Sequence, residues 1–236
     1  MRFLILAHPN DETAFHVAAH LLRRHGKADV RMVSPQELVL APFWGHRVAD
    51  PGGANELRLH DGTVIDNGST GVVFNRLRYL ETPHFTHAPA ADREYASMEL
   101  FALVLSWMHS LRCAVINAPR PHGLADYMRD SLHWQKLAGA VGFETVSLER
   151  NSREPEPRSS PDAAGRFEVV IAGDAVIGTG DRGLQRRCRD FAREANIDLM
   201  KLRFSPGDIF LSADPVPALT TAAEIKAAVD LLEARA

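Results

Sequence analysis

The sequence predicts an α/β protein: a Rossmann-like, parallel-sheet N-terminal domain followed by a small antiparallel α+β unit. Strand-like apolar runs alternate with amphipathic helical stretches through residues 1–150. Residues 166–236 instead follow the pattern hairpin, helix, hairpin, helix. Between them, residues 151–165 (NSREPEPRSSPDAAG) are rich in Pro, Ser and charge, which predicts a linker.

The first elements predict a β-α-β unit. Residues 2–7 and 30–33 are short apolar runs that suit buried strands. Asp11 is a good N-cap for the helix between them, and Gly26 is a good residue to end it. Parallel strands place the residues that follow them at one edge of the sheet, where open α/β sheets bind ligands.

The next elements are less regular. Asp61-Gly62 predicts a hairpin, and residues 71–74 and 114–116 predict core strands. Apolar spacing predicts helices over residues 91–109 and 123–141, followed by an extended segment at 145–148.

The C-terminal part has clear turn signals. Gly173-Asp174 and Pro206-Gly207 predict two hairpins, with an amphipathic helix between them. Thr221 and Glu224 have the spacing of a capping box, which predicts the start of a last helix.

Composition excludes some classes of protein. The chain has 236 residues, of which 45% are hydrophobic and 24% charged, and its formal net charge of -3 argues against nucleic-acid binding. No apolar run is long enough to span a membrane, and the apolar start is too short for a signal peptide, so we expect a cytoplasmic protein. Cys113 and Cys188 are expected to be reduced, buried thiols.

Candidate substrate-binding residues follow the strands of the expected parallel sheet: His8, Asp11, Arg76, Arg78 and Asn117. Arginine guanidinium groups suit carboxylates and other anions. A purely structural interpretation stays open for several of them. Asp11 could cap a helix, the two arginines could pair with Glu81, and Asn117 could form a turn before Pro119.

The string AHPNDE is similar to the HPDDE motif of zinc-dependent deacetylases, which gives an alternative hypothesis. In that motif the His and the second acidic residue bind zinc, and the first acidic residue is the base. Asn10 stands at the position of the base, and a neutral amide cannot take a proton from water. His84 and His87 have a spacing that suits a metal, but they lie in a Pro-flanked loop.

Four stretches resemble the ATP-grasp superfamily, in particular the microviridin-type, RimK-like ligases. They are LILAHPNDETAFHVAAHLLRRHG, HDGTVIDNGSTGVVFNRLRYLE, CAVINAPRPHGLADYMRDSLHWQKLAGAVGFETVSLERN, and FEVVIAGDAVIG with LMKLRFSPGDIFLSADPVPAL. The resemblance implies a pre-ATP-grasp domain over residues 1–150 and a truncated ATP-grasp domain over 166–236. Active members of the family bind ATP with Mg²⁺.

The sequence departs from that family at its nucleotide site. The phosphate-binding lobe, with its Lys and Gly-rich loop, would fall between Arg150 and Phe167, where only the linker stands. The family's magnesium ligands correspond to Lys201, Ser212 and Asp214, and only Asp214 stays a candidate metal ligand. No cofactor is therefore expected, with ATP and Mg²⁺ as the alternative.

Together these features predict a catalytically degenerate ATP-grasp-related protein that lacks most of its nucleotide-binding lobe. It is expected to bind a small molecule, a peptide or a partner, namely an intact ATP-grasp ligase or a second copy of itself. The alternatives are an ATP-dependent carboxylate-amine ligase whose ATP site is completed by another chain, and the zinc-dependent hydrolase. Lys201 is expected to pair with Asp214 in place of the metal.

Overall fold

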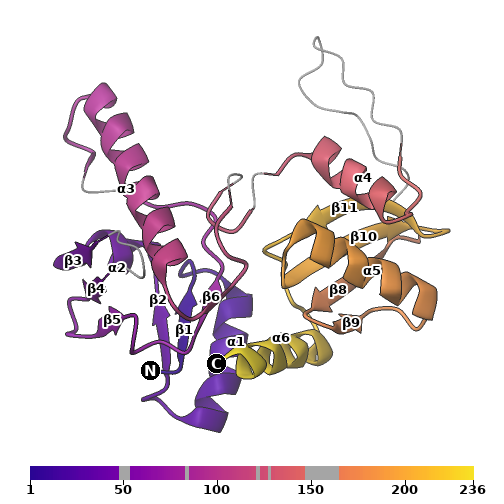
Figure 1. Cartoon of the computed structure of the whole chain (residues 1–236), viewed down its shortest axis with the longest axis horizontal. Coiled ribbons are helices and arrows are strands. Elements are labelled where there is room, and N and C mark those ends of the chain that lie inside the picture. Colours follow the sequence, from indigo (N-terminus) through magenta and orange to yellow (C-terminus); the bar gives the residue numbers. More distant parts are fainter. Residues whose placement is uncertain (48–53, 83–84, 121–122, 127–128, 147–164) are drawn as a thin grey trace. The chain divides into compact units, whose positions relative to one another are not determined.

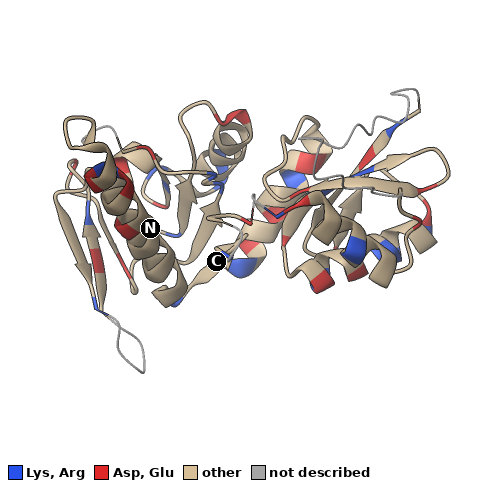
Figure 2. Ribbon diagram, turned by 90° about the horizontal axis from the view of Figure 1, so that it is seen from above, with Lys and Arg blue, Asp and Glu red and all other residues tan. Residues whose placement is uncertain are grey.

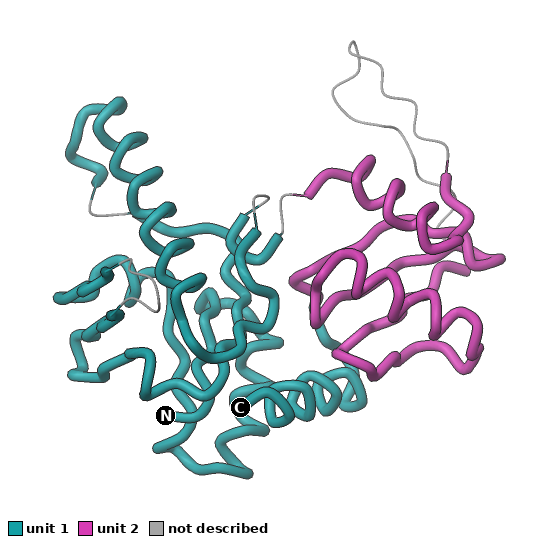
Figure 3. Tube along the Cα trace, in the orientation of Figure 1, with its two compact units in different colours: residues 1–127, 218–236 teal, residues 128–217 magenta. Residues whose placement is uncertain are grey.

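The computed structural model describes residues 1–47, 54–82, 85–120, 123–126, 129–146 and 165–236. The chain divides into two compact units (Figure 3). Unit 1 is Met1–Tyr127 with Ala218–Ala236, and unit 2 is Met128–Pro217. All of the expected linker 151–165 except its last residue lies outside the described residues. The division into 1–150 and 166–236 stays a prediction.

Unit 1 is built on a parallel sheet (Figure 1). Its strands run in the order β2-β1-β6-β7 and are all parallel: β1 (Phe3–Leu6), β2 (Val30–Val33), β6 (Val72–Asn75) and β7 (Ala114–Ile116). Every residue of β1 and β6 is buried, which explains why all of them except Asn75 are apolar. The carboxyl ends of β1, β6 and β7 therefore share one edge, as the α/β fold class predicts.

Two helices of unit 1 pack against each other, α1 (Glu12–His25) and α6 (Ala222–Arg235). The predicted caps are confirmed: the Asp11 carboxylate accepts the Ala14 N–H at 3.0 Å, and α6 begins with a full capping box. Helix α6 also contacts β6. It therefore belongs to unit 1, although the sequence-based division grouped it with residues 166–236.

The rest of unit 1 is a small antiparallel sheet with two helices. The elements are α2 (Pro35–Val39), β3 (Phe43–His46), β4 (Asn55–Arg58), β5 (Val64–Asp66) and α3 (Ala90–Ser110). The hairpin of β4 and β5 was predicted, whereas α2 and β3 were missed because both are short. His46 ties β3 to α3, since its Nε2 lies 2.7 Å from the Ser106 hydroxyl.

Unit 2 is an antiparallel sheet in the order β11-β10-β8-β9. Its elements are α4 (Ser131–Ala140), β8 (Phe167–Ala172), β9 (Ala175–Ile177), α5 (Arg182–Ala195), β10 (Leu199–Ser205) and β11 (Ile209–Asp214). Both predicted hairpins are confirmed. One face of the sheet packs on α4 and α5 through an aromatic core that includes Trp134, Phe143, Phe191, Phe204 and Phe210.

The predicted helix over residues 123–141 is wrong in its first part. Helix α4 begins only at Ser131, where the Asp130 carboxylate accepts the His133 N–H at 2.7 Å. Gly123 and Asp126 have φ angles of 119° and 58°, which a right-handed helix does not allow. In the expected extended segment 145–148, Thr145 forms a bridge to β11, and residues 147–148 lie outside the described residues.

None of the described helices combines the length and the apolar character that a membrane span requires. Figure 2 shows basic and acidic residues interspersed over both units.

Candidate functional site

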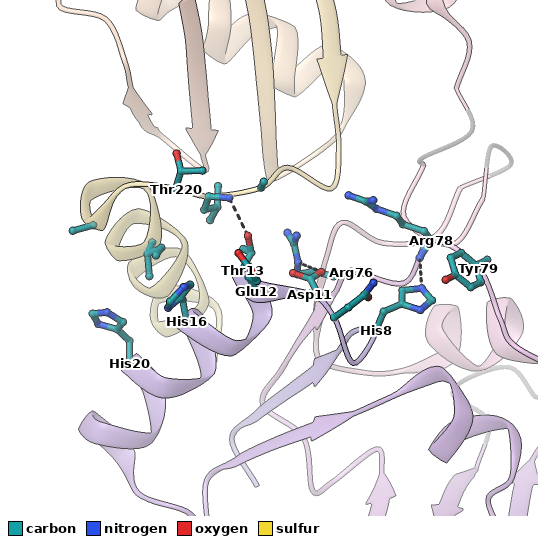
Figure 4. Close-up of a pocket in the computed structure, with 15 residues that line it drawn as sticks. His8, Asp11, Glu12, Thr13, His16, His20, Arg76, Arg78, Tyr79 and Thr220 are labelled. Carbon is teal, nitrogen blue, oxygen red and sulfur yellow. Dashed lines mark hydrogen bonds and ion pairs between the residues drawn. The ribbon is translucent and has the colours of Figure 1, made fainter.

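A pocket of about 620 Å³ lies in unit 1 beside the carboxyl ends of β1 and β6 (Figure 4). Four of the five predicted substrate-binding residues line it: His8, Asp11, Arg76 and Arg78. The other walls are the first turns of α1 and the segment that leads into α6. The pocket thus occupies the sheet edge that the β-α-β pattern predicts, and its volume suits a small ligand or part of a peptide.

Asp11 and Arg76 form an ion pair inside the pocket wall. The Arg76 Nε donates to the Asp11 Oδ2 at 2.7 Å, and the two side chains are 2% and 12% exposed. The other Asp11 oxygen accepts the N–H of Ala14 at the start of α1. Both carboxylate oxygens therefore bind within the protein, so Asp11 caps α1 and positions Arg76.

His8 is buried in the pocket wall next to these residues. Its Nε2 accepts the backbone N–H of Arg78 at 3.4 Å, and its ring centroid lies 4.2 Å from that of Tyr79. Burial lowers the pKa of His8, and the charges of Glu81 and Asp11 oppose this only in part. A neutral ring whose Nε2 accepts must carry its proton on Nδ1, which has no hydrogen-bond partner among the described residues.

The opposite wall of the pocket comes from α1 and the segment before α6. Thr13 joins the two, because its hydroxyl accepts the backbone N–H of Leu219 at 2.9 Å. His16 and His20 line the pocket from successive turns of α1, as Figure 4 shows. The sequence reasoning missed both histidines, although their spacing from Glu12 already places the three residues on one helix face.

Asn117 lies at the same sheet edge but does not line the pocket. It is 4% exposed, and its φ angle of 58° is left-handed. Its backbone carbonyl accepts the side-chain amide of Asn75 at 2.9 Å. This geometry fits the turn interpretation better than ligand binding.

A second charged cluster lies on the sheet of unit 2. In the antiparallel register Lys201 stands opposite Asp214, and Arg203 stands opposite Ser212. The Lys201 ammonium donates to Glu168 at 2.8 Å, and the Arg203 Nε donates to the other oxygen of Glu168 at 2.9 Å. Lys201 is 5% exposed and Glu168 44% exposed, so the cation is the buried member of the pair.

Glu168 is the residue of this cluster whose pKa is shifted by its neighbours. Desolvation raises the pKa of its carboxyl, but the hydrogen bonds and charges of Lys201 and Arg203 outweigh it and hold the pKa below its usual value. The expectation that Lys201 pairs with Asp214 therefore needs correction. The ion pair is made with Glu168, two residues along β8 from the register partner of Lys201, and a Lys side chain is long enough to reach that diagonal neighbour. An oxygen of Asp214 instead accepts the Val216 N–H at 2.9 Å.

No protein-family model and no curated protein matches the sequence. Solved structures do match. The RiPP-associated ATP-grasp ligase of Chryseobacterium gregarium, in complex with ADP and a leader and core peptide, superposes with a TM-score of 0.75 at 14% identity, covering 100% of this chain and 98% of that one. This chain has the fold of ATP-grasp ligases.

Two further ligases give the same result. The macrocyclase MdnC of Microcystis aeruginosa MRC, bound with precursor peptide MdnA, matches with a TM-score of 0.73 at 10% identity, over 99% of this chain and 100% of that chain. The ATP-grasp ligase PsnB, with minimal precursor, Mg and ADP, matches with a TM-score of 0.64 at 12% identity, over 99% and 97%. Such low identities show the fold alone. Because these matches cover nearly the whole of both chains, they do not support the expectation of a missing nucleotide-binding lobe.

The ATP-grasp fold also raises the question of whether the residues present could hold magnesium. The positions assigned from the family resemblance carry an ammonium group, a hydroxyl and one carboxylate, and the ammonium group would repel the ion. Among the described residues, no group of three or more His, Cys, Asp or Glu side chains is arranged to hold a metal. The zinc-hydrolase alternative therefore gains no support. Of its loop histidines, His84 lies outside the described residues, and His87 is exposed.

Proposed function

We propose that this chain is a catalytically degenerate ATP-grasp-fold protein that binds a peptide or small-molecule ligand. The observation that carries the proposal is the buried Lys201 with its ion pair to Glu168, at a position where the family resemblance implies a magnesium ligand. A fixed cation there supplies positive charge without a metal. It cannot change coordination or bridge two phosphates as Mg²⁺ does.

The pocket of unit 1 supports the binding part of the proposal. Arg78, an exposed residue, lines the pocket, and neutral His8 has a donor nitrogen in its wall. Both favour a ligand with a carboxylate or another anionic group. Since the matched ligases were solved with leader, core or precursor peptides, we take a peptide carboxylate as the leading ligand class.

The second candidate function is an ATP-dependent carboxylate-amine ligase, either alone or with an ATP site completed by another chain. The observation in its favour is that ligases of the same fold were solved with ADP, one of them with Mg as well. In that case Asp214 would be a metal ligand, and an intact ATP-grasp ligase or a second copy of this chain would be the partner.

A turnover assay tests the ligase candidate in the form that acts alone. The purified chain is incubated with ATP and Mg²⁺, and the ADP released is measured for the wild type and for Asp214→Ala. If the chain is catalytically degenerate, neither protein releases ADP above the level of a heat-inactivated sample. ADP release that disappears in Asp214→Ala would instead show that the chain turns over ATP at a site that includes Asp214, as the ligase candidate requires.

A further inference from the structure

The N-terminal half of α3 has no fully buried residue. The buried residues of this helix are Val104, Trp107 and Met108, all in its C-terminal half. Figure 1 shows the N-terminal half extending away from the parallel sheet. Most of the stability of a protein helix comes from tertiary packing of one face, so this half of α3 gains little of it from unit 1.

An apolar stripe runs along the side of α3 opposite its buried face. We call it the outer stripe, and it consists of the exposed residues Ala91, Tyr95, Met98 and Ala102. Tyr95 and Met98 at its centre are 67% and 65% exposed. The members are spaced alternately four and three residues apart, which is the spacing of the contact positions in a coiled coil. The outer stripe therefore has the geometry to pack against another helix.

Acidic residues border the outer stripe on both sides. On a helical projection Glu94 lies along one side, and Asp92 and Glu99 lie along the other. The one basic residue nearby, Arg93, donates to the carbonyls of Thr86 at 3.3 Å and Ala88 at 3.0 Å. It is thus directed back toward the start of its own helix, and the borders stay negative.

The negative borders decide which kind of partner can bind the outer stripe. In an antiparallel pair of copies, Asp92 of one chain would approach Glu99 of the other, and like charges at such positions are destabilising. An anionic membrane surface would be repelled for the same reason. A helix whose own apolar stripe is bordered by Lys and Arg would be attracted, and its charges would also set its register.

We infer that the outer stripe of α3 is a docking surface for an amphipathic helix with basic borders, supplied by another protein or peptide. The inference concerns a surface on α3 and is independent of the pocket and of the proposed function. The partner is defined by its chemistry: apolar residues at heptad spacing, with Lys or Arg on both sides of them.

A pair of designed peptides tests this inference on the full chain. The probe is a labelled helical peptide of about three heptads with Leu and Ile at the contact positions and Lys or Arg at the flanking positions. Its twin carries Glu at those flanking positions. Fluorescence anisotropy should give at least about tenfold tighter binding for the basic peptide, and the difference should shrink as salt is added.

Variants of the chain locate the binding. Met98→Lys should weaken binding of the basic peptide by about tenfold or more, because it places a charge within the contact. The double variant Glu94→Lys, Glu99→Lys should reverse the preference toward the acidic peptide. Leu132→Lys is the matched control, since Leu132 is an equally accessible apolar residue, 56% exposed, on α4 of unit 2.

Three results would overturn the inference. The first is no binding of the basic peptide, or equal binding of the two peptides. The second is binding that Met98→Lys leaves unchanged. The third is self-association of the chain in sedimentation experiments that Met98→Lys abolishes, which would assign the outer stripe to a second copy.

Discussion

Units 1 and 2 each bury a cation beside a carboxylate, but the surroundings of the two pairs differ. In unit 1 Asp11 holds Arg76 while also capping a helix, and the pair forms part of the wall of an open pocket. In unit 2 Lys201 and Arg203 share Glu168 on the surface of a sheet, and Lys201 is the residue that the family resemblance assigns to a magnesium ligand.

Similar ion pairs can therefore have different roles in the two units. The pair in unit 1 has a structural role, and its neighbours His8 and Arg78 line the same pocket. For the pair in unit 2 we propose that its fixed positive charge takes the place of a magnesium ion. A buried pair is weak evidence for stability in general, so each role has to be tested by removing one partner.

The largest effect is expected for Arg76→Met. This change leaves the Asp11 carboxylate, which is 12% exposed, without its cation, and it should lower the free energy of unfolding by about 3 kcal/mol. Chemical denaturation measures it. Arg78→Met, two residues away and exposed, is the control and should change stability little. Equal losses for the two variants would mean that the Asp11 pair has no special role.

A smaller effect is expected for Lys201→Met. Glu168 is partly exposed and keeps Arg203, so the loss should be about 2 kcal/mol, the value of a hydrogen bond between charged groups. Lys136→Met on the exposed side of α4 is the matched control. If the two variants have the same thermal midpoint, Lys201 is not a structural replacement for the metal.

Thr13→Val tests the hydrogen bond that joins α1 to the segment before α6 in the pocket wall of unit 1. The substitution keeps the shape of the side chain but removes the acceptor for the buried N–H of Leu219, which should cost about 1 kcal/mol. The same measurement on Thr145→Val, an exposed position of unit 2, should show a negligible change. A loss no greater than that of the control would show that the Thr13 hydroxyl does not secure the segment before α6.

The smallest effect concerns pH. Burial lowers the pKa of His8 in the folded state below its unfolded value of 6.5, so below that pH the unfolded chain binds a proton that the folded chain does not. The contribution of His8 to stability is therefore present above pH 6.5 and is lost as the pH falls toward the folded-state pKa. His8→Gln should show a shallower fall in stability between about pH 7 and 5 than the wild type. A slope shared by His8→Gln and the wild type would contradict this assignment.

Local signals in the sequence account for most of the fold and for four of the five pocket candidates. Caps, two-residue turns and buried apolar runs are set by neighbouring residues, so Asp11, Gly173-Asp174 and the capping box at Thr221 were predictable. The partner of Lys201 was not, because Glu168 comes beside it only through the order of strands in the sheet. The role of Asp11 likewise depends on Arg76, which lies 65 positions along the chain.

We propose that unit 2 has replaced magnesium by its own cation, so that the chain does not hold nucleotide tightly. Isothermal titration of the full chain with ATP in excess Mg²⁺ tests this most directly. We predict no binding with a Kd below roughly 10 μM, equivalent to about -7 kcal/mol. Tighter binding that requires Mg²⁺ and is lost in Asp214→Ala would contradict the claim and establish a working ATP-grasp site.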